Sequence, residues 1–90
     1  MIRQPDSDED AGTLALRALV WTLVEPERAQ RLLAVTGLDP RDLKARIGDP
    51  AVLSASLQFL LANEADLLAC ADGLGVPPTA LARAAGELDA

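Results

Sequence analysis

Five basic side chains lie close together in the first half of this 90-residue chain. They are Arg28, Arg31, Arg41, Lys44 and Arg46. The spacing puts them on two neighbouring predicted helices, where guanidinium and ammonium groups can pair with carboxylates. We therefore treat them as a candidate interaction surface, suited to an acidic partner or to head-to-tail contact between copies. A solvated surface of mixed charge is the alternative interpretation.

The residue types that most often carry catalysis are nearly absent. The chain has no histidine, the commonest general base and metal ligand, and it has one cysteine. Ser54 and Ser56 have no base within reach along the sequence. Gly73-Leu74-Gly75 precedes two prolines rather than a lysine, so it does not match a phosphate loop. We predict that the protein is not an enzyme and has no catalytic residue, cofactor or metal site.

Two single residues each allow two interpretations. Cys70 could be a reactive thiol, but it lies in a stretch rich in Ala and Leu without a nearby cation to lower its pKa, which favours inert packing. Trp21 could be a binding hot spot or the main space-filling residue of a core poor in aromatic residues. The sequence leaves open whether Trp21 belongs to the core or to an interface.

The charge pattern argues against nucleic acid as a partner. The net charge is −6, and Asp6, Asp8, Glu9 and Asp10 crowd the first ten residues. Such a field repels phosphate backbones, which need clustered Lys and Arg.

A helix-turn-helix is nevertheless the alternative function. Leu33, Gly37, Leu38 and Leu43 have the apolar and small spacing of that motif. The would-be recognition helix, however, begins with Asp39-Pro40-Arg41-Asp42 and presents carboxylates to the groove. A DNA-binding regulator is therefore the second choice.

No segment of the sequence indicates a membrane. The longest apolar stretch, residues 14–24, is interrupted by Arg17 and Thr22 and is shorter than the ~20 residues of a membrane span. The N-terminal residues lack the apolar core of a signal peptide. One unpaired cysteine is typical of a reducing compartment, so we expect a cytoplasmic protein.

Helix signals divide the chain into short segments. The apolar half of the composition is dominated by Ala and Leu, which favour helices over strands. Proline and asparagine or aspartate at predicted helix starts, and glycine at predicted ends, delimit the segments. The predicted helices are 11–24, 26–36, 40 to Gly48, one from Pro50, one from Asn63, and 78–88, although the fourth and fifth could also run on as one helix.

Hydrophobic spacing predicts which faces of these helices are buried. Residues at intervals of three and four positions form the predicted inward stripes. On the first helix these are Leu16, Leu19, Val20 and Leu23; on the second Ala29, Leu32, Leu33 and Val35; and on the fifth Leu67, Leu68, Ala71 and Leu74.

The chain also repeats itself in outline. The turn from Gly37 to Gly48 has a second version from Gly75 to Gly86. Aligning the preceding helices places Leu16, Val20, Leu23 and Val24 opposite Leu53, Leu57, Leu60 and Leu61, with one residue of offset before the turns. Two related three-helix units are one interpretation, and a shared vocabulary of caps and turns is the other.

Four segments resemble a small alphaproteobacterial family, the domain-of-unknown-function family numbered 3572. These segments are Ala18-Leu19-Val20-Trp21 through Glu25-Pro26-Glu27, the turn Thr36–Leu43, Gly48-Asp49-Pro50, and Gln58-Phe59-Leu60-Leu61-Ala62-Asn63-Glu64. The chain departs from the usual pattern at Gln58, where an acid often stands, and at Val76-Pro77-Pro78. The resemblance implies a small helical cytoplasmic protein and brings no functional residues with it.

Together these observations predict an all-α protein, a compact orthogonal bundle of five or six short helices. Residues 1–10 are predicted to be a disordered acidic tail and residues 11–90 a single helical domain. The favoured function is a non-catalytic protein-interaction module that binds an unknown protein or another copy of itself, without nucleic acid or membrane.

Overall fold

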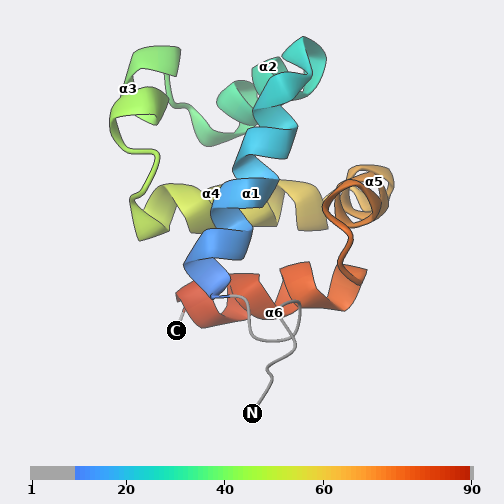
Figure 1. The fold of residues 1–90 in the computed structure, drawn as a ribbon. Coiled ribbons are helices and arrows are strands. Elements are labelled where there is room, and N and C mark those ends of the chain that lie inside the picture. The colour runs from blue at the N-terminus through green and yellow to red at the C-terminus, as the bar shows by residue number, and fades with distance from the viewer. Residues whose placement is uncertain (1–9, 90) are drawn as a thin grey trace.

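A computed structural model describes residues 10–89, in which the chain forms six α-helices and no β-strand. The helices are α1 (Ala11–Val24), α2 (Pro26–Thr36), α3 (Pro40–Ala45), α4 (Pro50–Leu61), α5 (Glu64–Leu74) and α6 (Pro78–Asp89) (Figure 1). The all-α prediction is confirmed. The predicted disordered tail falls outside the described residues except for Asp10, which is the N-cap of α1.

Side-chain caps set the helix starts. The carboxylates of Asp10, Asp39 and Asp49 accept hydrogen bonds from backbone N–H groups in the first turns of α1, α3 and α4. Asn63 Oδ1 accepts from the Asp66 N–H at 3.2 Å, so α4 and α5 are separate helices. Where α2 and α5 end, Gly37 and Gly75 adopt left-handed φ angles of 76° and 73°.

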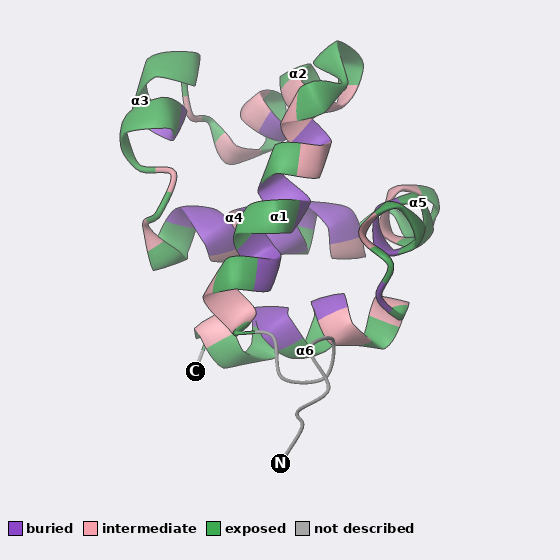
Figure 2. Cartoon of the chain, viewed as in Figure 1, coloured by how far each residue is buried: buried purple, intermediate pink, exposed green. Residues whose placement is uncertain are grey.

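The core lies where α1 crosses α4. Helix α6 packs against both of them and against α5, whereas α3 stands apart at the edge of the molecule (Figure 1). Leu19, Leu57, Leu60 and Leu81 have no exposed surface, and the buried segments gather around this crossing (Figure 2). Helices that cross in this way form the orthogonal bundle that the short segments predicted.

Helix α1 buries a different face from the predicted one. Its buried residues are Leu14, Ala15, Ala18, Leu19 and Thr22. Leu16 and Val20, predicted to be inward, are 38% and 49% exposed. The predictions for Val35 and Leu68 are wrong for the same reason, because an apolar type was taken as evidence of burial, and both side chains are exposed.

The two halves of the chain correspond with a constant shift of 38 residues, without the extra offset that we predicted. Gly37 and Gly75 are related by this shift. So are Trp21 and Phe59. The bounds of α2, Pro26–Thr36, become those of α5, Glu64–Leu74. The buried residues of α1 become Val52, Leu53, Ser56, Leu57 and Leu60, all buried on α4. We call residues 11–48 the first unit and residues 49–89 the second unit.

The units differ in their third helix. Helix α3 has 6 residues and α6 has 12. In the second unit, Asp89 at the end of α6 accepts hydrogen bonds from Ser54 Oγ and Gln58 Nε2. The shift of 38 residues relates these two positions to Leu16 and Val20. Because α3 ends at Ala45 and the chain must begin α4 at Pro50, the first unit has no equivalent of the end of α6. Leu16 and Val20 are apolar and exposed, whereas Ser54 is half-buried and Gln58 is exposed.

Candidate interaction surface

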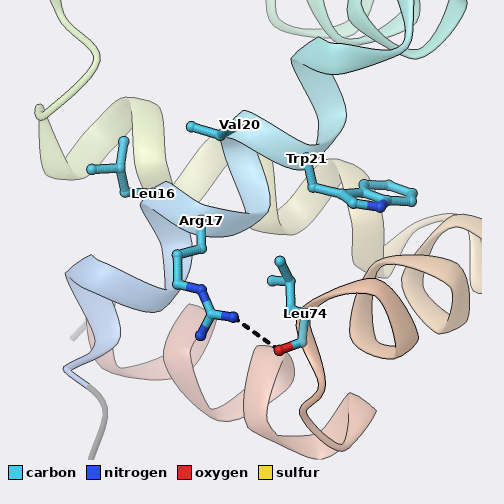
Figure 3. A pocket seen from close by; sticks show the side chains of 5 residues that line it. All are labelled: Leu16, Arg17, Val20, Trp21 and Leu74. Carbon is cyan, nitrogen blue, oxygen red and sulfur yellow. Dashed lines mark hydrogen bonds between the residues drawn. The ribbon is translucent and has the colours of Figure 1, made fainter.

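The uncovered part of α1 forms one side of a shallow apolar groove of about 430 Å³. Leu16, Arg17, Val20 and Trp21 of α1 line it together with Leu74 at the end of α5 (Figure 3). We call this surface the α1 groove. The Arg17 guanidinium donates a hydrogen bond of 2.9 Å to the Leu74 carbonyl oxygen, which connects the two sides. The groove thus combines apolar walls with one positive charge.

Trp21 contacts one neighbour on α2 and one on α5. The Cζ atom of Arg28 lies 3.6 Å from the indole centroid, and its Nη2 donates to the Trp21 carbonyl oxygen at 2.8 Å. On α5, a Cβ added to Gly73 would lie 2.9 Å from Trp21 Nε1, so only glycine fits there without displacement. Trp21 is partly buried and packs against the core. It is therefore a core contact that also forms one wall of the α1 groove.

The structure engages three of the five candidate basic residues in internal contacts. Arg28 covers Trp21, Arg31 forms a 2.9 Å ion pair with Asp66, and Arg46 forms a 3.2 Å ion pair with Asp49. Arg28 is partly buried, whereas the Arg31 side chain keeps 40% of its surface exposed beside Asp66.

The protonation of the paired groups follows these contacts. The hydrogen bond with Asp66 is the main cause of a raised pKa at Arg31. The Ala51 N–H and the guanidinium of Arg46 lower the pKa of Asp49. These groups therefore stay charged near neutral pH, and their pairs join segments of this chain to each other.

The remaining two basic residues belong to α3. Arg41 and Lys44 are exposed and line a shallow depression with Asp39 and Pro40. Among residues 10–89 neither has an ion-pair partner. Of the five candidate residues, only Arg41 and Lys44 are therefore exposed without an ion pair or ring contact among residues 10–89.

The segment from α2 to α3 resembles a helix-turn-helix in its turn but lacks a recognition helix of usual length. The α2–Gly37–α3 segment has the turn, and Leu43 is buried as the motif requires. However, α3 is less than two turns long and carries Asp42 between its two basic residues. A helix of this length offers few side chains to a major groove.

Cys70 of α5 is fully buried. The shift of 38 residues relates it to Leu32 of α2, which is also buried. Burial raises the pKa of its thiol to about 11, although Arg28 and Arg17 act in the opposite direction. The thiol is therefore protonated and shielded, as the packing interpretation predicts.

We expect Cys70 to react slowly with iodoacetamide at pH 8 in the folded protein and rapidly in concentrated guanidinium chloride. Because the folded pKa of about 11 exceeds the ordinary value of 9.0, its contribution to stability is complete below pH 9 and is lost as the pH rises toward 11. The free energy of unfolding, measured as a function of pH, should show this fall, and Cys70→Ala should remove the part of the fall that the thiol causes. Fast labelling of the native protein would contradict the assigned burial.

The chain was compared with known families, curated proteins and solved structures. The model of a family described as "Protein of unknown function (DUF3572)" matches residues 8–90. The chain belongs to this family. No curated protein and no solved structure matches this DUF3572 chain.

The described part of the DUF3572 chain adds two negative findings. Within residues 10–89, no helix is long and apolar enough to cross a bilayer. Over the same range, no group of three or more Cys, Asp or Glu side chains is placed to hold a metal ion.

Proposed function

We propose that this DUF3572 chain is a non-catalytic protein-interaction module that contacts its partner through the α1 groove. The observation that carries this proposal is the exposure of Leu16 and Val20 beside a tryptophan that the fold holds in place. The absence of histidine supports a role without catalysis.

The composition of the groove fits a binding surface better than a stability requirement. Leu16 and Val20 give less to the folding of the isolated chain than core residues do, because 38% and 49% of their surface remains in water. Tryptophan and arginine are the residue types most enriched among interface hot spots, and here Trp21 and Arg17 lie on the same groove. A partner that covers this groove removes the exposed area from water.

The other parts of the proposal rest on the sequence. A cytoplasmic location is supported by the single unpaired cysteine. A protein partner is favoured over nucleic acid by the net charge of −6 and by the shortness of α3.

Site-specific photocrosslinking in cells of the source organism tests this function. A photoreactive amino acid at Val20 should give defined adducts with a protein, and the same residue at Val35 should not. Val35 is the matched control because it is also an exposed valine, 70% against 49% for Val20, and lies on α2 outside the α1 groove. Equal adduct patterns at the two positions, or adducts at neither, would overturn the proposed function.

A further inference from the structure

We propose that an apolar pocket beneath α3 binds a medium-chain carboxylate, with the alkyl chain inside and the carboxylate beside Lys44. The pocket has a volume of about 300 Å³, and side chains of α1, α2, α3 and the connection after α3 line it. Apart from Lys44, the side chains that line it are apolar. We call it the α3 pocket. It has no lining residue in common with the α1 groove, so this inference goes beyond the proposed function and does not depend on it.

The inner face of α3 forms one wall of the pocket. Pro40, Leu43 and Ile47 follow one another at intervals of three and four residues, so they share this face. Leu43 is only 5% exposed, which shows that the face is turned toward the molecule. Nevertheless, α3 packs closely against no other helix of residues 10–89 and lies at the edge of the molecule (Figure 1). The two apolar walls are therefore held apart, and the space between them is the α3 pocket.

The opposite wall is anchored in the core. Leu23 of α1 and Leu33 of α2 are partly buried and pack against the core cluster. Ala29 lies one turn before Leu33 on α2, and its short side chain leaves room beside them. Moving an alkyl chain from water onto such walls tightens binding by about fourfold for each buried methylene.

The size of the pocket favours a slender chain over a helix. One turn of an α-helix with its side chains, about 10 Å wide and 5.4 Å long, fills roughly 400 Å³. A methylene needs about the space of a water molecule, ~30 Å³, so the α3 pocket holds about ten of them. Mainly apolar walls with a single polar group at this volume are typical of small-molecule sites.

The rim of the pocket favours a negatively charged head group. Lys44 lines both the α3 pocket and the exposed depression that contains Arg41, one turn before it. Neither side chain has an ion-pair partner among residues 10–89. Of the neighbouring acids, Asp39 accepts the Asp42 N–H at 2.8 Å as the helix cap, and Asp42 lines neither hollow. A carboxylate at this rim can accept a hydrogen bond from the Lys44 ammonium group, whereas a cationic head group would be repelled.

Calorimetric titration of the full chain with straight-chain carboxylates, from hexanoate to dodecanoate below their micelle concentrations, tests the inference. We expect one site per chain. The affinity should rise about fourfold per methylene and level off near ten carbons, because further methylenes extend into water. In methyl NMR spectra, decanoate should shift the signals of Leu43 and Ile47 and leave that of Val20 in the α1 groove unchanged.

Two matched substitutions on α2 test the walls of the pocket. Ala29→Phe fills part of the pocket and should weaken decanoate binding at least twentyfold. Ala34→Phe makes the same change at an exposed position of α2 outside the pocket and should bind like the unsubstituted chain. Circular dichroism checks that both variants fold. If Ala29→Phe does not fold, the smaller change Ala29→Val should lower the chain length at which the affinity levels off.

Lys44→Gln tests the head group. This variant should bind decanoate about fivefold more weakly at low salt, the upper range for an exposed ion pair, and should bind decan-1-ol unchanged. Arg83→Gln is the matched control, because Arg83 is an exposed cation on α6 away from the pocket, and it should alter neither affinity.

Three results would overturn the inference. They are the absence of saturable binding for every acid in the series, binding that Ala29→Phe leaves unchanged, and binding of decyltrimethylammonium as tight as that of decanoate. The first would indicate that the pocket receives an apolar side chain of a protein instead. None of the three concerns the α1 groove, which crosslinking at Val20 tests separately.

Discussion

Replacing Leu57 with alanine is expected to lower the free energy of unfolding by about 3–5 kcal/mol, the upper range for a buried leucine. Leu57 has no exposed surface and lies in the core around the α1–α4 crossing (Figure 2). Alanine there removes apolar contacts and leaves a cavity that the crossing helices cannot readily close. Since domains of this size have stabilities of about 5–10 kcal/mol, the variant should be partly unfolded at room temperature. Urea denaturation followed by circular dichroism measures the loss.

The control for this substitution is Leu16→Ala on α1. Hydrophobic spacing predicted that Leu16 lies in the inward stripe, but the structure leaves it 38% exposed. Its loss should cost about 1 kcal/mol or less, because part of the removed surface was already in water. Equal losses for Leu57→Ala and Leu16→Ala would contradict the face that α1 buries.

Trp21→Ala is expected to cost about 2–4 kcal/mol and to abolish contact with the partner of the α1 groove as well. The stability loss comes from the contact with the core and from the Arg28 guanidinium 3.6 Å above the ring. The loss of partner contact comes from removing one wall of the α1 groove. Trp21→Phe should recover part of the stability, because a smaller ring still offers a face to Arg28.

The two effects of Trp21→Ala are measured separately, by urea denaturation and by photocrosslinking at Val20. A variant that crosslinks normally would show that the groove is not the contact surface. One that keeps the full unfolding free energy would show that the indole is not part of the core.

Local signals in the sequence predicted the helix boundaries well. A cap such as Asn63 acts on the backbone N–H groups of its own helix, so its effect depends on residues three or four positions away. The effect of Gly37 and Gly75 is also local, because each allows the left-handed backbone conformation that ends its own helix. The bounds of α1 and α2 therefore agree with the prediction.

Burial could not be predicted equally well because it depends on distant helices. On α1 most positions are apolar, so periodicity does not distinguish the face with Leu19 from the face with Val20. The face that is buried is the one against which α4 and α6 pack, and both helices lie far along the chain from α1. The predicted alignment of the two halves was one residue out of register. Leucines were matched with leucines by type, because the sequence did not show which positions are buried.

The candidate site was predicted only in part. The five basic residues were grouped by their proximity in sequence, but the partner of Arg31 is Asp66, 35 residues further along the chain. Leu16 and Val20 were assigned to the core, so the α1 groove was missed. The shift of 38 residues between glycines 37 and 75 was the available signal, because it pairs Leu16 and Val20 with the polar Ser54 and Gln58.

The fluorescence of Trp21 is the most direct test of the α1 groove as a contact surface, because it is the single tryptophan of the chain. The account predicts that its emission maximum moves to shorter wavelength when the partner that crosslinks at Val20 is added. The Val20→Glu variant should show no such shift. Binding of that partner to the unsubstituted chain with an unchanged Trp21 emission would contradict the account, because it would place the contact elsewhere on the molecule.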